Sequence, residues 1–347
     1  MRQHQHGSSM NTVVRAAGPA HLESLRLGAP TAATVKWKIA MTRARQVVAI
    51  EVLLRATLVL ANALLMACSH AEATIGTRDL LALVRTTPID AGHTACAVFD
   101  ADGTLWDFDL SGTLTEQTLV HKRASDAGLP ALNASLQSFG LPAATDIYAA
   151  AQAMTKAYET KQLYAIGETQ GLDEDAVNVR IWPQYNWLYV DQRPAELEQL
   201  ATQLMVEQAY DARIFAGMRA VIGALRERQF HVYVISGGVH EFVVAGAARL
   251  GFSPVEAHGL KLVVQDGRLT PQVVAPVPYK QGKATLALQL CGGKPLFAFG
   301  DSVATGDAAM LQLAAIPVAV RPHGRHLTAA HTQQMRIYEH PETGDAP

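Results

Sequence analysis

The chain lacks several features that would place it in other functional classes. It has no long basic run and a formal net charge of −2, so it lacks the electrostatic footprint of a nucleic-acid-binding protein, and we expect no nucleic-acid partner. Its three cysteines, Cys68, Cys96 and Cys291, do not have the spacing of metal ligands. Because Cys96 and Cys291 lie near expected strands, we expect buried free thiols there, with a disulfide between them as the alternative if the protein is exported.

What the chain does have is enough apolar sequence for a folded core. Its 347 residues are 49% hydrophobic and 17% charged, which suffices for one sizeable core and an inserted domain. No internal repeat or low-complexity tract divides it. We therefore expect a globular protein and not a fibrous or disordered one.

The N-terminal ninety residues differ from the rest. Residues 1–40 show no persuasive period and indicate a disordered extension, or sequence upstream of a true start at Met41. Residues 41–68 resemble a secretory signal, because a basic start is followed by the uncharged run Ala56 to Ala67. That run is too short for a membrane span of about 20 residues. Leu65-Met-Ala-Cys68 resembles a lipoprotein processing site, so a lipidated Cys68 would anchor the protein to a membrane.

A second interpretation of this segment is an amphipathic helix that packs on the folded domain. Glu51 and Arg55 interrupt the apolar stretch and favour it. We expect export to the periplasm or the envelope, and a cytoplasmic protein if this second interpretation holds.

The most informative segment is Val98 to Trp106, which reads Val-Phe-Asp-Ala-Asp-Gly-Thr-Leu-Trp. The apolar residues before Asp100 are typical of a buried central strand, and Gly103 lets the backbone turn just past its end. This places Asp100 and Asp102 in the crevice where open α/β sheets bind ligands. Asp100 could attack a phosphorus atom, Asp102 could act as general acid and base, and Mg²⁺ would let the anionic nucleophile approach an anionic substrate.

Two further segments supply groups that suit a phosphoryl substrate. Phe230 to Gly238 is an apolar strand that ends in Ser236, where a hydroxyl and free backbone N–H groups could bind phosphoryl oxygens. Lys283 begins a helical pattern, and its ammonium could neutralise Asp100 and the phosphoryl group. Each is weak evidence alone, because serines often cap helices and most lysines are solvated.

A fourth segment, Pro295 to Leu311, is again a buried strand that runs into a loop with two aspartates. Asp301 and Asp307 could hold Mg²⁺ directly or through water. The four segments, in this order, resemble the motifs of the haloacid-dehalogenase superfamily. Their sequences are closest to those of its phosphoserine-phosphatase-like branch. The resemblance covers Thr94 to Arg321.

The resemblance implies a role for each matching residue. Asp100 is the nucleophile, Asp102 the general acid and base, and Lys283 the charge stabiliser. Substrate phosphate is bound at Ser236 and Gly237. The implied Mg²⁺ site comprises Asp100, Asp102, Asp301 and Asp307. The presence of Asp102 favours phosphoryl transfer over dehalogenation, since members that cleave carbon–halogen bonds generally lack it.

Two positions depart from the family pattern or leave a choice. The loop between Asp301 and Asp307 is longer than the usual three or four residues, which puts the role of Asp307 in question. Lys280 is a rival to Lys283, and the helical apolar spacing after Lys283 favours the latter.

The alternation of apolar runs predicts an α/β fold with a Rossmann-like parallel sheet and a mainly helical cap inserted after the first strand. Expected strands are Ala95 to Asp100, Phe230 to Ser236, Pro295 to Gly300 and Ile316 to Val320, with a β-hairpin over Glu256 to Tyr279. The predicted core comprises residues 94–108 and 212–325, the cap residues 109–211, and a C-terminal tail residues 326–347.

The cap would select the substrate, a small phosphate ester. Asp109 lies where phosphoserine phosphatases carry a glutamate that holds the substrate's amino group, so we expect it to bind a cationic head group. The aromatic residues Trp182, Tyr185, Trp187 and Tyr189, joined by Trp106, could instead enclose a quaternary ammonium, as the resemblance to phosphorylcholine phosphatases suggests, or simply pack a core. We therefore predict a Mg²⁺-dependent phosphomonoesterase. The alternatives are a phosphorylcholine or phosphoethanolamine phosphatase, a phosphotransferase, and a non-catalytic envelope lipoprotein.

Overall fold

A computed structural model describes residues 74–339 of the chain. The predicted N-terminal extension, the signal-like segment 41–68 and the lipidation site at Cys68 lie outside the described residues. Within the described range, none of the helices combines the length and the apolar character that crossing a membrane requires.

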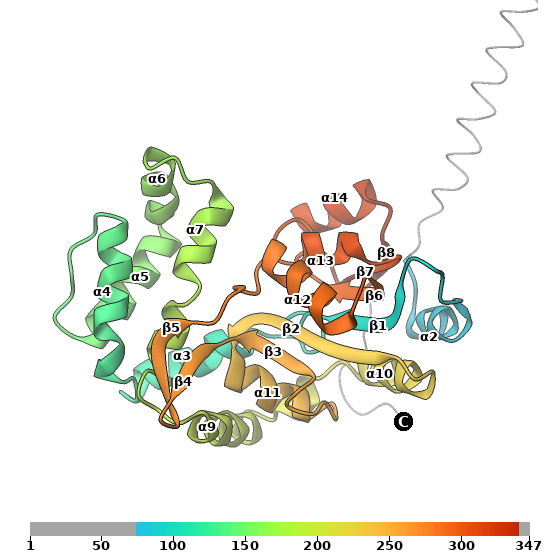
Figure 1. The fold of residues 1–347 in the computed structure, drawn as a ribbon, viewed down its shortest axis with the longest axis horizontal. Helices are drawn as coiled ribbons and strands as arrows, with labels where there is room; N and C mark the ends of the chain where they lie inside the picture. Colours follow the sequence, from blue (N-terminus) through green and yellow to red (C-terminus); the bar gives the residue numbers. More distant parts are fainter. Residues whose placement is uncertain (1–73, 340–347) are drawn as a thin grey trace, which may run out of the picture. The chain divides into compact units, whose positions relative to one another are not determined.

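The core is a six-stranded, all-parallel sheet in the order β3-β2-β1-β6-β7-β8 (Figure 1). The strand that carries the first aspartates, β1, lies inside the sheet between β2 and β6. The strands are β1 (Thr94–Phe99), β2 (His231–Val239), β3 (Ala257–Leu260), β6 (Pro295–Gly300), β7 (Ile316–Val320) and β8 (Arg336–Tyr338). The predicted α/β fold is confirmed.

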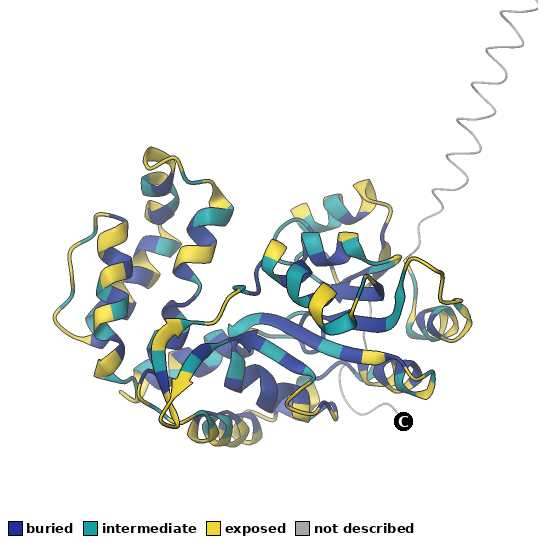
Figure 2. Cartoon of the chain, viewed as in Figure 1, coloured by how far each residue is buried: buried dark blue, intermediate teal, exposed yellow. Residues whose placement is uncertain are grey.

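Helices cover both faces of this sheet, which explains why its strands read as continuous apolar runs. Along β1, Ala97 and Phe99 belong to one hydrophobic cluster, whereas Cys96 and Val98 belong to a second one on the opposite face. Figure 2 shows these central strands as largely buried. The first face is covered by α2 (Thr77–Thr86), α10 (Ala216–Glu227) and α11 (His240–Ala248), and the second by α12 (Gln281–Cys291), α13 (Ala308–Leu313) and α14 (Arg325–Thr332).

The insertion between β1 and β2 is helical, as predicted. In Figure 1, α4 to α7 form a group apart from the sheet, whereas α3 and α9 contact the core helix α11. The separate helical lobe is therefore shorter than the predicted cap of residues 109–211. The helices are α3 (Leu110–Val120), α4 (Leu129–Ser138), α5 (Ile147–Glu159), α6 (Gln162–Thr169), α7 (Glu174–Ile181), α8 (Gln184–Trp187) and α9 (Pro194–Glu207).

Two boundary predictions differ from the structure. The hairpin expected over Glu256 to Tyr279 is shorter, because β4 (Leu262–Gln265) and β5 (Arg268–Val273) form it while the preceding β3 joins the main sheet. The tail predicted from residue 326 is wrong, because α14 and the edge strand β8 complete the core there. Strand β8 has only three residues, too few to produce a readable alternation.

Cys96 and Cys291 form a disulfide with a Cα–Cα distance of 5.6 Å, so the expectation of free thiols is wrong. Cys96 lies on the face of β1 that α12 covers, and Cys291 is the last residue of that helix. The two residues are 195 positions apart in the sequence, so only the packing of α12 on β1 brings them together.

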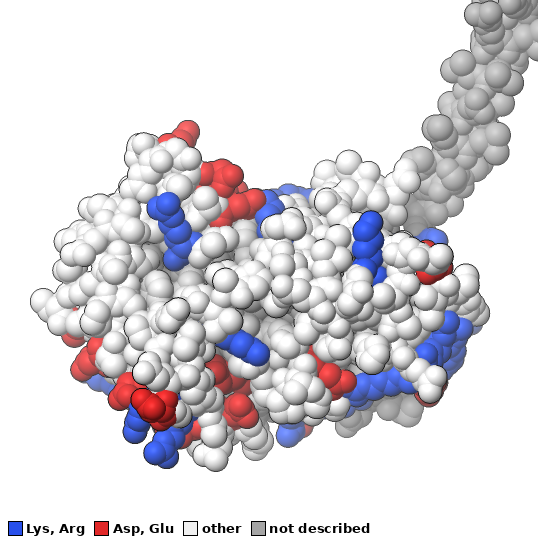
Figure 3. Space-filling model, in the orientation of Figure 1, with Lys and Arg blue, Asp and Glu red and all other residues white. Residues whose placement is uncertain are grey.

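Charged side chains are sparse on the face shown in Figure 3. Most of the visible surface is uncharged, and Lys and Arg gather mainly near α10.

Candidate active site

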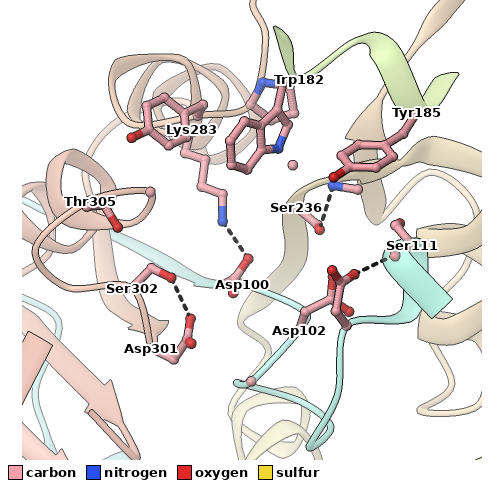
Figure 4. Close-up of a pocket in the computed structure, with 18 of the residues that line it drawn as sticks. Asp100, Asp102, Ser111, Trp182, Tyr185, Ser236, Lys283, Asp301, Ser302 and Thr305 are labelled. Carbon is pink, nitrogen blue, oxygen red and sulfur yellow. Dashed lines mark hydrogen bonds and ion pairs between the residues drawn. The ribbon is translucent and has the colours of Figure 1, made fainter. Parts of the chain in front are cut away.

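The predicted core residues meet at the carboxyl ends of three adjacent strands (Figure 4). Asp100 directly follows β1, Asp301 directly follows β6, and Ser236 lies near the end of β2. Parallel strands bring such residues to one edge of the sheet, where the crevice of an open α/β fold lies. Lys283 reaches this edge from the first turn of α12.

Lys283 joins two of the aspartates. Its Nζ lies 2.5 Å from Oδ1 of Asp100 and 2.6 Å from Oδ1 of Asp307. All three side chains are buried, with Asp307 fully enclosed. The rival Lys280 is directed elsewhere and pairs with Asp175 of α7.

Asp100, Asp301 and Asp307 form a compact acidic cluster. Each offers a carboxylate oxygen, and these three atoms lie within 4.8 Å of one another. The long loop does not remove Asp307 from this group, because the Ser302 N–H donates to Asp307 Oδ2 at 2.9 Å and closes the loop on itself. The extra residues of this loop therefore lie between Asp301 and Asp307 without moving either aspartate out of the cluster.

Gly103 permits this cluster to form. Its φ is +74°, and a Cβ at this position would lie 2.6 Å from Asp301 Oδ2. A side chain would thus be both strained and in contact with the acidic cluster. The next residue, Thr104, is fully buried and donates from Oγ1 to Asp100 Oδ2 at 3.4 Å. Thr104 stands within the first motif, but its residue type alone does not indicate this contact.

Asp102 was predicted to be a metal ligand together with Asp100, Asp301 and Asp307. Its carboxylate, however, does not belong to the acidic cluster that these three residues form. Its Oδ1 accepts hydrogen bonds from Trp106 Nε1 at 2.6 Å and from the Leu110 N–H at 3.0 Å. Trp106 is fully buried and cannot be part of an aromatic enclosure in the cavity. Instead, it orients Asp102.

The aspartates have unusual proton affinities. Burial, with a further contribution from the charge of Asp307, raises the pKa of Asp100 to about 8, and Lys283 opposes the rise. Burial, followed by the charge of Asp109, raises the pKa of Asp102 to about 8. Burial and the charge of Asp307 raise the pKa of Asp301 to about 7. Burial alone would lower the pKa of Lys283, but Asp100 and Asp307 raise it above its usual value.

The cluster places three carboxyl groups beside one ammonium, that of Lys283. Three carboxylates within 4.8 Å are the hard oxygen donors that Mg²⁺ binds in proteins. A divalent cation among Asp100, Asp301 and Asp307 would supply the missing positive charge. The donor set fits Mg²⁺.

The Ser236 turn forms the phosphate side of the cavity. Ser236 is buried, and its Oγ accepts from the Gly238 N–H at 3.1 Å. A Cβ on Gly237 would lie 2.5 Å from Trp182 Nε1, so glycine lets this cap side chain lie directly on the turn. Ser111 of α3 also lines the cavity and accepts from the Val239 N–H at 3.0 Å. No motif in the sequence points to Ser111, which α3 brings to the site by packing on β2.

The cavity above these residues has a volume of about 620 Å³. Asp109 lines it while its Oδ1 caps α3 by accepting from the Gly112 N–H at 2.7 Å. The predicted aromatic group divides: Trp182 and Tyr185 line the cavity, whereas Trp187 bonds to the Pro271 carbonyl.

The other aromatic residues follow the same division. Tyr189 is fully buried and donates to Thr118, so it packs the interior as the alternative interpretation held. The aromatic rings that line the cavity from the segment between β1 and β2 and from the linker before α12 are Phe108, Tyr158, Trp182, Tyr185 and Tyr279. No sequence pattern points to Tyr158 or Tyr279, because neither stands in the aromatic cluster of residues 182–189.

Comparison with known families gives this arrangement a name. Residues 97–312 match the haloacid dehalogenase-like hydrolases, and this range is more than half of the chain. The chain belongs to this family. The predicted family and the predicted hydrolase class are confirmed. The matched range includes every core residue described above, from Asp100 to Asp307.

Individual relatives of this hydrolase are more distant. The phosphoserine phosphatase of Streptomyces coelicolor is 32% identical over 146 residues, which cover 40% of this chain and 34% of that protein. The chain thus matches about a third of that relative's length.

Two solved structures share the fold of this hydrolase. A protein of unknown function from Bordetella pertussis Tohama I has a TM-score of 0.51 at 17% identity, and the match covers 70% of this chain and 97% of that one. A functionally unknown protein from Anaerococcus prevotii DSM 20548 has a TM-score of 0.50 at 16% identity, over 76% and 90% of the two chains. These two similarities show a shared fold.

Proposed function

We propose that this hydrolase is a Mg²⁺-dependent phosphomonoesterase that cleaves a small phosphate ester through an aspartyl-phosphate on Asp100. One observation carries the proposal. The buried ammonium of Lys283 contacts Asp100 and Asp307 together, so a carboxylate nucleophile and an acidic metal-binding cluster adjoin at the end of one cavity.

In the first step, a carboxylate oxygen of Asp100 attacks phosphorus, and the bond from phosphorus to the ester oxygen breaks. The leaving oxygen takes its proton from Asp102, whose pKa of about 8 keeps that group protonated near neutral pH. Trp106 and Leu110 hold the carboxyl group of Asp102 through Oδ1. Lys283 opposes the rise in the pKa of Asp100, and a divalent cation held at the acidic cluster would lower that pKa further and favour the ionised, nucleophilic form.

In the second step, Asp102, now ionised, takes a proton from water, and the water oxygen attacks phosphorus. The bond between phosphorus and Asp100 breaks, inorganic phosphate leaves, and both carboxyl groups return to their starting states. When bound, Mg²⁺ would offset the negative charge shared by the phosphoryl group and the Asp100, Asp301 and Asp307 carboxylates. Ser236 and the backbone of its turn would bind phosphoryl oxygens.

An amine-bearing ester of the phosphoserine type is the substrate that we favour. Asp109 lines the cavity and would offer its side-chain oxygens to an ammonium group, and the partial relative from Streptomyces coelicolor is named a phosphoserine phosphatase. Phosphocholine or phosphoethanolamine is the second candidate. Trp182, Tyr185 and Tyr279 line the same cavity, and aromatic faces attract ammonium groups.

Export to an oxidising compartment is part of the proposal. The Cys96–Cys291 disulfide supports it, since such bonds persist mainly outside the cytosol. Fractionation of cells, with alkylation of free thiols before mass analysis, tests this point. A cytosolic protein with both thiols reduced would contradict export.

Phosphate release by the full chain tests the activity. We expect Mg²⁺-dependent release from p-nitrophenyl phosphate, and preference among phosphoserine, phosphocholine and phosphoethanolamine would identify the head group. Asp100→Asn should remove release from every ester while the circular dichroism spectrum stays unchanged. Release that persists in Asp100→Asn would contradict the mechanism, and stimulation by an alcohol acceptor with transfer to it would indicate a phosphotransferase.

A further inference from the structure

The segment Tyr279-Lys280 connects the helical insertion to the core through side-chain contacts. Lys280 Nζ lies 2.5 Å from Asp175 Oδ2 on α7. The Tyr279 hydroxyl donates to Asp175 Oδ1 at 3.3 Å and accepts from Asn178 Nδ2 at 3.0 Å. Two consecutive core residues are therefore bound to two residues of one cap helix.

The same segment is bound to the catalytic loop through its backbone. The Lys280 N–H donates to the Gly306 carbonyl at 2.8 Å, and Gly306 directly precedes Asp307. Lys280 is also the residue at the N-cap position of α12, three residues before Lys283. Lys280 thus contacts the cap with its side chain, the Asp301 to Asp307 loop with its N–H group, and the helix of Lys283 through the chain.

The backbone of Lys280 has a conformation that favours glycine. Its φ is +44° and its ψ is −109°, a region that residues with a Cβ rarely adopt. Such strain persists only where the surrounding contacts hold it, and it occurs often at functional sites. A lysine here retains a side chain that reaches Asp175, which a glycine would not.

We propose that Tyr279, Lys280, Asp175 and Asn178 form a clasp that couples the position of the cap to the positions of Lys283 and Asp307. Tyr279 also lines the cavity, and its ring lies 5.2 Å from that of Trp182. When the clasp is closed, the cap aromatics cover the Ser236 turn while the loop holds Asp307 against Lys283. Lys280 and Asp175 are positioning residues, and the kinetic part of their test rests on the proposed phosphatase activity.

Steady-state kinetics with p-nitrophenyl phosphate provide the first test. Because the clasp acts on Lys283 and Asp307, Lys280→Met and Asp175→Asn should each lower kcat by about 10-fold, with smaller changes in KM. The double variant should be no slower than either single variant, and Lys280→Arg should recover most of the loss. Glu174→Gln is the matched control, since Glu174 is the neighbour of Asp175 on α7 and its ion pair with Arg325, at 3.9 Å, is exposed.

Lys280→Gly separates positioning from stability. Glycine relieves the strain at this φ but loses the side chain that reaches Asp175. We expect Lys280→Gly to melt at a higher temperature than Lys280→Met and to be no more active. Recovery of wild-type kcat in Lys280→Gly would overturn the clasp, because the side chain would then be dispensable.

Hydrogen exchange tests the coupling without relying on hydrolysis. In the full chain, Asp175→Asn should make the amides of Val303 to Asp307 exchange about 5-fold faster, whereas Glu174→Gln should leave them unchanged. Unchanged exchange in Asp175→Asn would overturn the clasp, as would additive effects in the double variant or an effect confined to KM. If the wild-type protein hydrolyses no ester, the proposed function fails and the exchange result alone decides the clasp.

Discussion

The two walls of the cavity are held in place by different interactions. On the core wall, Asp100, Lys283 and Asp307 are buried and joined by ion pairs at 2.5 and 2.6 Å. On the cap wall, Trp182 and Tyr185 are only partly buried, and Trp182 makes a tilted ring contact with Tyr279. The core wall thus holds charged groups in one arrangement, while the cap wall presents broad apolar faces.

This difference suggests a division of labour. Fixed and desolvated charges favour a reaction whose charge develops at one place, so the core wall suits bond breaking at phosphorus. Aromatic faces bind many groups with modest energy, so the cap wall suits selection among head groups. Core variants should therefore affect every ester alike, whereas cap variants should change the order of preference.

The largest expected effect is that of Lys283→Met. This change leaves Asp100 and Asp307 without their buried partner, so turnover of every ester should be lost. The free energy of unfolding should fall by about 3 kcal/mol at about pH 8 in the presence of a chelator. The loss should be smaller at about pH 5, because the raised pKa of Asp100 lets that group take up a proton. Urea denaturation measures both values.

Lys280→Met is the control for this prediction, since its ion pair with Asp175 is partly exposed and contributes about 0 to 1 kcal/mol to stability. If the Lys283→Met and Lys280→Met proteins had equal free energies of unfolding, the buried ion pair would contribute no more to stability than the partly exposed one, which would contradict this prediction.

Glu241 on α11 extends the comparison between buried and exposed charges, because it is a buried carboxyl group of the core. Burial raises its pKa from 4.5 to about 7, with Glu198 adding to the rise and Lys261 opposing it. Because the folded protein retains a proton that the unfolded chain releases, stability falls as the pH rises from 4.5 to about 7. Glu241→Gln should therefore be more stable than wild type by up to about 3 kcal/mol at about pH 8.

At about pH 4 the two proteins should unfold at similar urea concentrations, because Glu241 is then protonated in both the folded and unfolded states. A Glu241→Gln protein that is less stable than wild type at about pH 8 would mean that the ionised carboxylate makes a favourable interaction.

Trp182→Leu tests the cap wall. Loss of the ring should lower kcat/KM for the preferred amine-bearing ester by about 5- to 30-fold, since a desolvated cation–π contact contributes about 1 to 2 kcal/mol. The value for p-nitrophenyl phosphate should change less, because that ester has no ammonium group. Equal losses of kcat/KM for both esters would mean that Trp182, like the core residues, acts on the reaction and not on the choice of head group.

The smallest effect is expected for Asp109→Asn. Asparagine can still accept the hydrogen bond from Gly112 that caps α3, so the helix should be unaffected. Loss of the charge should weaken binding of an amine-bearing ester by about 1 kcal/mol, seen as a higher KM. Asp109→Ala would add the loss of the cap, and a thermal melt distinguishes the two variants.

The core of the site could be predicted from the sequence because its residues stand at strand ends. Asp100, Ser236 and Asp301 each follow an apolar run that only a buried strand explains. Helical spacing distinguishes Lys283 from Lys280, and in the structure Lys283 pairs with Asp100 while Lys280 pairs with Asp175. In these places, local pattern and tertiary position coincide.

The remaining residues depend on packing between distant segments. Ser111 reaches the cavity because α3 contacts β2, and the bond from Cys96 to Cys291 forms because α12 lies on β1. Among the aromatics, Trp182 lines the cavity while Tyr189 packs the interior. The direction in which such side chains point depends on how α7 and α8 dock, which no local pattern specifies.

The most direct test of the account is to locate the phosphoryl group on the protein. Asp102→Asn should slow the attack of water on the intermediate, so an acid-quenched reaction with p-nitrophenyl phosphate should retain phosphate on the protein. We predict that mass spectrometry of the digested protein will find it on Asp100 alone, in a form that hydroxylamine releases. Phosphate on another residue, or release from every ester without any phosphorylated protein, would contradict the central role of Asp100.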